Sequence, residues 1–137
     1  MISVVLDTNT LVSGLGWSGP PSVIVDSVVA GELLLVSSPP LLSELARVLA
    51  YPKLATAFPD PAGVTERIRV LADTVEPLFT LAVVADEPDN RVLEAAVEGR
   101  VDAVVTGDGG LLGLGDYNAI PIMSAGRFLE WREGHQR

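Results

Sequence analysis

Four acidic residues stand at positions where carboxylates often do chemistry: Asp7, Glu44, Asp89 and Asp108. The first and the last each follow a short apolar run, the second lies inside a predicted helix, and the third lies near the start of another. Taken singly, each has an ordinary structural explanation, because a Glu on a helix is usually solvated and Asp is common at helix starts and in turns. Taken together, they indicate a shared carboxylate site.

A cleft that gathers several carboxylates is electrostatically unfavourable, because like charges raise one another's pKa. A divalent cation removes that cost, and a donor set of carboxylate oxygens favours Mg²⁺ or Mn²⁺ over zinc. Such an ion can activate water and stabilise the charge on a phosphoryl oxygen. The sequence offers little for other mechanisms, since it has no cysteine, one histidine (His135) and one lysine (Lys53). We therefore expect metal-dependent chemistry on a phosphorylated substrate.

Short apolar runs and turn residues divide the chain into alternating strands and helices. Strands are predicted over residues 2–6, 33–36, 81–84, 102–106 and 120–123. Helices are predicted over residues 20–30, 39–50, 64–75, 88–98 and 124–131. Glycine-rich segments at residues 14–19 and 109–118 are predicted as loops, the second with room for one helical turn.

This alternation of strands and helices predicts the fold class. Strands separated by helices require crossover connections, which build a parallel sheet covered on both faces. The predicted fold is therefore α/β, a three-layer α/β/α arrangement with a central parallel sheet. In such sheets function gathers at the carboxyl ends of the strands. Asp7 and Asp108 each follow a predicted strand, so we expect the site at this edge.

Length and composition limit the class of protein. A chain of 137 residues, 48% of them apolar, predicts a single domain over residues 1–137, with a disordered tail that includes His135. The net charge of −9 does not suit a duplex-DNA binder, which usually carries a basic face. Glycine and proline break the uncharged run of residues 8–25, and no basic residue precedes Arg47, so neither a membrane span nor a signal peptide is expected. The expected location is the cytoplasm.

Four segments, in order along the chain, resemble the motifs of the PIN-domain ribonuclease family, which includes VapC-like toxins of toxin–antitoxin pairs. The segments are Val-Leu-Asp-Thr-Asn-Thr-Leu-Val (5–12), Ser-Pro-Pro-Leu-Leu-Ser-Glu-Leu-Ala-Arg-Val-Leu (38–49), Asp-Glu-Pro-Asp-Asn-Arg-Val-Leu-Glu-Ala-Ala (86–96) and Asp-Ala-Val-Val-Thr-Gly-Asp-Gly-Gly-Leu-Leu (102–112). Residues 120–129 also fit the family's closing segment. Each motif is short, but the four together are specific.

The resemblance implies a function and a set of site residues. Asp7, Glu44, Asp89 and Asp108 would be the catalytic residues and would bind one or two Mg²⁺ or Mn²⁺ ions. Asn9 and Thr106 would support them through hydrogen bonds, and no other cofactor is implied. The implied activity is that of an endoribonuclease, which hydrolyses RNA phosphodiester bonds with metal-activated water. The implied partners are the RNA substrate, a cognate antitoxin and a second copy of the chain in a homodimer.

The sequence departs from the family pattern in two places. Gly109 and Gly110 stand where the family often has a second acid after the fourth motif residue. The family's common segment is Asp-Pro-Asp-Asp-Asn, in which proline precedes the acid, whereas here the acid Glu87 precedes Pro88. Asp86 is then either a peripheral ligand or without a role. These changes bear on a second metal ion more than on the first.

Two other enzyme classes share part of the pattern. Haloacid-dehalogenase-like phosphatases begin with a strand ending in Asp-x-Asp, which would make Asp7 a nucleophile, but here Asn9 replaces the expected general acid–base. A G-x-G-x-x-G pattern at Gly14, Gly16 and Gly19 resembles a dinucleotide-binding loop, but it does not directly follow its strand.

A non-catalytic domain that binds RNA or a protein partner also remains open. The missing acid at Gly110 is compatible with it. The net charge of −9 disfavours free RNA binding unless metal ions or a local basic strip assist. The arginines that could form such a strip are Arg47, Arg91, Arg100 and Arg127.

Overall fold

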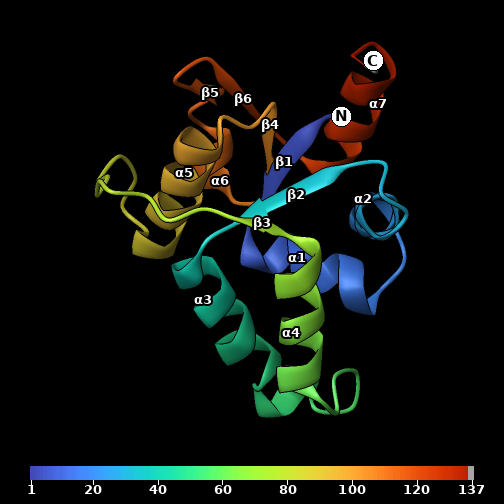
Figure 1. Ribbon diagram of the computed structural model, residues 1–137. Coiled ribbons are helices and arrows are strands. Elements are labelled where there is room, and N and C mark those ends of the chain that lie inside the picture. The colour runs from blue at the N-terminus through green and yellow to red at the C-terminus, as the bar shows by residue number, and fades with distance from the viewer. Residues whose placement is uncertain (136–137) are drawn as a thin grey trace.

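The computed structural model describes residues 1–135, whose strands form one six-stranded sheet in the order β3-β2-β1-β4-β6-β5 (Figure 1). The strands are β1 (Ser3–Leu6), β2 (Leu34–Ser37), β3 (Asp73–Thr74), β4 (Ala103–Val105), β5 (Asp116–Tyr117) and β6 (Ile120–Met123). Every neighbouring pair is parallel except β5 and β6, which are antiparallel. The sheet is therefore mostly parallel, as the alternation of elements predicts.

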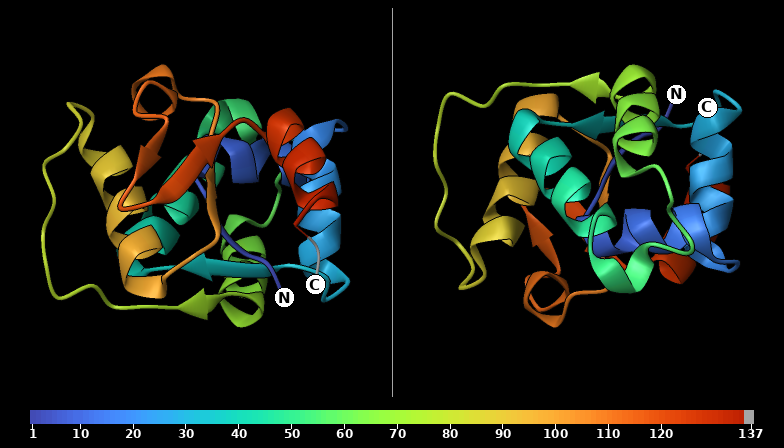
Figure 2. Two further views of the ribbon diagram at one scale, coloured as in Figure 1. Left: turned by 90° about the horizontal axis from the view of Figure 1, so that it is seen from above. Right: turned by 90° about the horizontal axis from the view of Figure 1, so that it is seen from below.

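Helices cover both faces of this sheet. They are α1 (Thr8–Gly16), α2 (Pro20–Val29), α3 (Pro39–Leu49), α4 (Pro61–Leu71), α5 (Glu87–Gly99), α6 (Gly109–Leu112) and α7 (Ala125–Glu133), with a short 3₁₀ turn at Pro52–Leu54. Figure 2 shows α2 and α7 side by side on one side of the sheet and α5 on the other. The predicted three-layer α/β/α fold is confirmed.

Two apolar cores lie between these layers, one on each face of the sheet. Successive strand residues point to opposite faces, so Val4 and Leu6 of β1 pack with α1, α2 and α7, whereas Val5 packs with α5. All three side chains are buried. The sheet is thus buried on both sides, and only its strand ends and edges remain available for a site.

The structure confirms two of the predicted helix starts, at Ser38 and Ser124. The Ser38 side chain caps α3 by accepting a hydrogen bond from the Leu41 N–H, and Ser124 caps α7 by accepting one from the Arg127 N–H. An N-cap hydroxyl satisfies a backbone donor that has no partner in the first helical turn. These caps fix where α3 and α7 begin at the carboxyl edge of the sheet.

The predicted loop over residues 14–19 is wrong in its first part, because Gly14 and Gly16 lie in α1. A Cβ on Gly14 would lie 2.6 Å from the carbonyl oxygen of Pro21, so the close packing of α1 on α2 requires a glycine there. Packing, not flexibility, explains this residue. The glycines of the G-x-G-x-x-G pattern therefore do not form a phosphate-binding turn after a strand.

Three other predicted elements differ from the structure, one of them the loop predicted over residues 109–118, in which Asp116–Tyr117 form β5. Residues 81–84 do not form a strand but part of a long connection between β3 and α5. The helix predicted over residues 64–75 begins earlier and ends at Leu71, and the chain then enters the sheet as β3.

The C-terminal end was predicted as a disordered tail. Residues 136 and 137 lie outside the described part of the chain. The ring of His135 stacks on Trp131 at 4.0 Å between centroids.

No helix within residues 1–135 has the length and apolar character needed to cross a membrane.

Candidate metal centre

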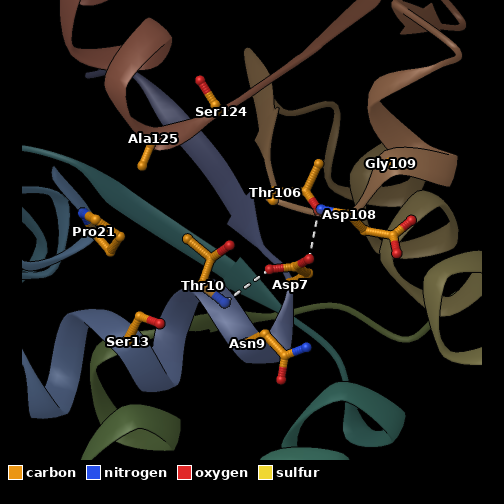
Figure 3. A pocket seen from close by; sticks show the side chains of 11 residues that line it. Asp7, Asn9, Thr10, Ser13, Pro21, Thr106, Asp108, Gly109, Ser124 and Ala125 are labelled. Atoms are coloured by element: carbon orange, nitrogen blue, oxygen red, sulfur yellow. Dashed lines mark hydrogen bonds between the residues drawn. The ribbon is translucent and has the colours of Figure 1, made fainter.

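Asp7 lies where β1 ends and α1 begins, and its carboxylate is held by two hydrogen bonds. Its Oδ1 accepts from the Thr10 N–H at 2.9 Å, which caps α1, and its Oδ2 accepts from the Thr106 hydroxyl at 2.5 Å (Figure 3). Thr106 follows β4, so this bond joins the ends of two neighbouring strands. The side chain of Asp7 is therefore buried and fixed.

Asp108 is positioned by the same threonine and by a helix start. Its backbone N–H donates to the Thr106 hydroxyl at 2.9 Å, and its Oδ2 accepts from the Leu111 N–H at 3.0 Å as the cap of α6. The hydrogen bond from the Leu111 N–H, and then the side-chain hydrogen bond with Asp89, lower the pKa of Asp108 below its usual range. Asp108 is therefore a fixed anion at the carboxyl edge of β4.

Asp89 lies in the first turn of α5 and is buried, with 7% of its surface exposed. Its Oδ2 has no hydrogen-bond partner within residues 1–135. Burial, followed by a side-chain hydrogen bond with Asp108 and by the charges of Asp108, Asp86 and Asp7, raises its pKa from 3.8 to about 7. A buried carboxylate without a partner is costly, so this oxygen lacks a ligand that would stabilise its charge.

Asp86, Asp89 and Asp108 form a compact cluster, which we call the acidic cluster. Each offers one carboxylate oxygen, and these oxygens all lie within 4.8 Å of one another. Asp86 is exposed and precedes α5 as its N-cap residue, although its side chain does not cap the helix. Asp86, whose role the sequence left open, is thus placed beside two of the four predicted acids.

Glu44 lies on α3, to one side of the acidic cluster. Its Oε1 accepts a hydrogen bond from the Thr8 hydroxyl, and its Oε2 lies 3.7 Å from Arg47. Glu44, Asp7 and Asp89 line one cavity of about 200 Å³. Glu44 therefore faces the same hollow as Asp7 and Asp89 without belonging to the acidic cluster itself.

A second cavity, of about 440 Å³, also borders Asp7. It is lined by Asp7, Asn9, Thr106 and Asp108, together with residues from the starts of α1, α2 and α7. Asn9 also lines the smaller cavity, but its side chain makes no hydrogen bond to the acids within residues 1–135. All four predicted acids therefore face two hollows that share Asp7 and Asn9.

The four arginines that the sequence offers as a basic strip for RNA binding have different neighbours in the structure. Arg91 is paired with Glu94 at 2.9 Å, and Arg127 with Glu130 at 3.7 Å. Arg100 ends α5, far along the helix from the acidic cluster. Arg47 is the one basic residue among those that line the two cavities. Arg47 itself lies 3.7 Å from Glu44, and Arg91 lines a third cavity with Glu44, so both guanidinium groups lie near this acid.

The chemistry of these donors fits a hard divalent cation. Mg²⁺ and Mn²⁺ prefer oxygen ligands, and the acidic cluster supplies only carboxylate oxygens. The unpartnered Oδ2 of Asp89 is the atom that would gain most from a cation, since its pKa already shows that the charged form is disfavoured. Asp86, Asp89 and Asp108, with Asp7 beside them, could hold such an ion.

Comparison with known families agrees with this arrangement. Residues 3–109 match the model of a family described as PIN domain, a range that includes Asp7, Glu44, Asp86, Asp89 and Asp108. No curated protein matched the chain. PIN domains are generally nucleases that use divalent metal ions. Since the match covers well over half of the 137 residues, the chain belongs to the PIN domain family.

Proposed function

We propose that this protein is a metal-dependent endoribonuclease whose ion is held by the acidic cluster and Asp7. The observation that carries the proposal is the buried Oδ2 of Asp89, which has no partner within residues 1–135 although two other carboxylates lie within reach of the same point. A bound divalent cation supplies water activation and neutralises charge on a phosphoryl oxygen. The family match supports nuclease chemistry at this place.

The chain's own residues have distinct tasks in this proposal. Thr106 donates to Asp7 and accepts from the Asp108 N–H, so one hydroxyl sets the spacing of two acids. The start of α6 fixes the Asp108 carboxylate. Glu44 extends the acidic wall on the α3 side. These contacts hold the oxygens in place before any ion binds.

An RNA strand is the substrate that we propose for the two cavities. Both cavities are lined by Asp7 and Asn9, so a chain that passes over the acids can occupy both. Their lining contains one basic side chain, Arg47, in a protein of net charge −9. Binding of a polyanion at such a site depends on the divalent ion, because few basic groups are present to attract phosphates.

The phosphatase alternative is less well supported by the residues around Asp7. Such a phosphatase needs a general acid–base two residues after its nucleophile, but Asn9, which lines both cavities with Asp7, cannot take that role. Oδ2 of Asp89 has no hydrogen-bond partner within residues 1–135, although a side-chain hydrogen bond with Asp108 contributes to the raised pKa of Asp89. The geometry favours a ligand role for the acids.

We also propose that the protein is the toxin of a toxin–antitoxin pair, acts in the cytoplasm and forms a homodimer. This part rests on the resemblance of the four sequence motifs to VapC-like toxins. A small gene for a DNA-binding antitoxin directly upstream would support it. Growth arrest on expression, relieved by that neighbour, would be the functional counterpart.

The decisive test of the activity is cleavage of a labelled single-stranded RNA with EDTA, Mg²⁺ or Mn²⁺. We expect cleavage with either ion and none with EDTA. A small phosphomonoester in the same assay should remain intact. Hydrolysis of the monoester with intact RNA would favour the phosphatase, and metal binding without any cleavage would favour a non-catalytic RNA-binding domain.

A further inference from the structure

The connection between β3 and α5 is tied to other backbone groups only near its two ends in the described part of the chain, at Val75 and Asp86. No backbone–backbone hydrogen bond involves residues 76–85 in the described part of the chain. Figure 2 shows this segment as a long trace that runs outside the sheet before it enters α5. Its last residues lead directly into Asp86 of the acidic cluster. Something other than the sheet must therefore hold this approach in place.

The fully buried side chain of Asn90 binds the backbone of this segment. Its Oδ1 accepts from the N–H groups of Val83 at 2.9 Å and Val84 at 3.0 Å, while its Nδ2 donates to the Val84 carbonyl at 2.9 Å. The same Nδ2 lies 3.2 Å from Glu87 Oε1. Asn90 therefore replaces the backbone partners that a neighbouring strand would supply.

A second pair of side chains holds the segment further upstream. Glu94 accepts from the Leu81 N–H at 2.8 Å, and Arg91 donates to the Leu81 carbonyl at 3.0 Å. Leu81 lies five residues before Asp86, whereas Val84 lies two residues before it. Of the two attachments, the one made by Asn90 is therefore closer to the acidic cluster.

We propose that Asn90 is a positioning residue for divalent-cation binding, which acts by fixing the backbone that presents Asp86. Asn90 lines neither of the two cavities that contain the acids, so it would not touch the ion. The Asp86 carbonyl accepts from the Asp89 N–H at 3.1 Å, which ties Asp86 to α5, but its exposed side chain makes no cap bond, so the direction of that side chain also depends on the backbone before it. This inference rests on the proposed metal-dependent function.

Only an amide meets both demands at position 90. The Oδ1 must accept two hydrogen bonds and the Nδ2 must donate to a carbonyl. A carboxylate of the same shape can accept but cannot donate, and it would face the Val84 carbonyl oxygen with like partial charge. An alanine provides neither function and leaves three backbone groups without their partner.

The test is a double-mutant cycle read by calorimetric titration of Mn²⁺ into the protein without RNA. We expect Asn90→Ala to weaken Mn²⁺ binding by about 10- to 100-fold, the range found when residues behind metal ligands are changed. Asp86→Asn should weaken it as well, and adding Asn90→Ala to Asp86→Asn should cause little further loss. Losses that simply add in the double variant would overturn the proposal, since Asn90 would then not act through Asp86.

Glu94→Ala is the matched control. It removes one of the two hydrogen bonds that attach Leu81, so it should lower the thermal midpoint while leaving Mn²⁺ affinity within about twofold of the unchanged protein. If Asn90→Ala behaves in the same way, with lower stability and unchanged affinity, its role is structural only and the proposal is wrong.

Asn90→Asp gives a second test if Asn90→Ala does not fold. An extra negative charge near the acids would by itself tighten cation binding, whereas loss of the donor to Val84 would weaken it. We expect weaker binding, and tighter binding would contradict the positioning role. If the unchanged protein binds no Mn²⁺, the proposed function itself fails, a result distinct from an unaltered affinity in the Asn90 variants.

Discussion

Asp7 and Asp89 are the same residue type, almost equally buried at 6% and 7% exposure, yet their surroundings are opposite. Both oxygens of Asp7 accept hydrogen bonds from the chain, one from a backbone N–H and one from a hydroxyl. One oxygen of Asp89 has no partner within residues 1–135, and burial, followed by the neighbouring carboxyl groups, raises its pKa to about 7. The protein itself supplies hydrogen bonds to both carboxylate oxygens of Asp7, whereas Oδ2 of Asp89 is placed where a cation could bind it.

The largest expected effect of this difference is on RNA cleavage. Asp89→Asn removes the unpartnered charge at the acidic cluster, so we expect cleavage with Mn²⁺ to fall by at least about 100-fold. Asp26→Asn, at an exposed position on α2, is the control and should cleave normally. The measurement is the rate of cleavage of a labelled single-stranded RNA. Near-normal cleavage by the Asp89 variant would remove this residue from the site.

The next effect is on thermal stability in the presence of a divalent ion. A cation that binds only the folded protein stabilises it by about 2.7 kcal/mol at 100 times its dissociation constant. We therefore expect Mn²⁺ to raise the unfolding temperature of the unchanged protein and EDTA to reverse the rise. The Asp89→Asn variant should show little of this increase in differential scanning calorimetry. An equal increase in both proteins would place the ion elsewhere.

The pH dependence of stability without metal should separate the two aspartates further. Because the pKa of Asp89 rises from 3.8 to about 7 on folding, the folded state keeps a proton that the unfolded state loses between these values. The free energy of unfolding should therefore fall as the pH rises from about 4 to about 7. Asp108, with its lowered pKa, acts oppositely and at more acidic pH, where its contribution is lost as the pH falls.

Urea unfolding in EDTA across this pH range measures the effect. The Asp89→Asn variant should show a flatter profile and should be more stable than the unchanged protein at pH 8. Asp26→Asn should keep the slope of the unchanged protein. A slope that survives in the Asp89 variant would mean that another group causes it.

The last expected effect is on stability and concerns Asp7, whose carboxylate accepts a hydrogen bond from Thr106. Thr106→Val removes the hydroxyl that donates to Asp7 and accepts from the Asp108 N–H, so it leaves buried polar groups unpartnered. We expect a loss of about 1–3 kcal/mol in the free energy of unfolding. Thr106→Ser keeps the hydroxyl and should retain most of the stability. Equal stability of the two variants would show that this bond does not hold Asp7.

The sequence predicts the fold well where local signals and packing agree. The apolar run before Asp7 and the Ser38 cap mark a strand and a helix that the structure contains. Glycine disfavours helices, so Gly14 and Gly16 suggest a loop, whereas the structure uses Gly14 to bring α1 close to α2. That requirement comes from a neighbouring helix and has no local signal.

Part of the candidate site was also accessible from the sequence. Asp7 and Asp108 follow strands, and parallel strands end at a common edge, so their proximity follows from the fold. The place of Asp86 depends on how residues 76–85 approach α5, and the buried amide of Asn90 controls that approach. The apolar run Leu81–Val84 has the composition of a strand. Its sequence does not show that the side chains of α5, rather than a neighbouring strand, bind its backbone groups.

In the proposed site, Asp86, Asp89 and Asp108 share a divalent cation. Anomalous diffraction from crystals grown with Mn²⁺ tests it most directly, since the signal identifies the ion and its position. We predict a manganese peak within coordinating distance of Asp89 Oδ2 and of at least one oxygen from the other two residues. A manganese peak bound elsewhere, or saturating Mn²⁺ with the acidic cluster still unoccupied, would contradict the account.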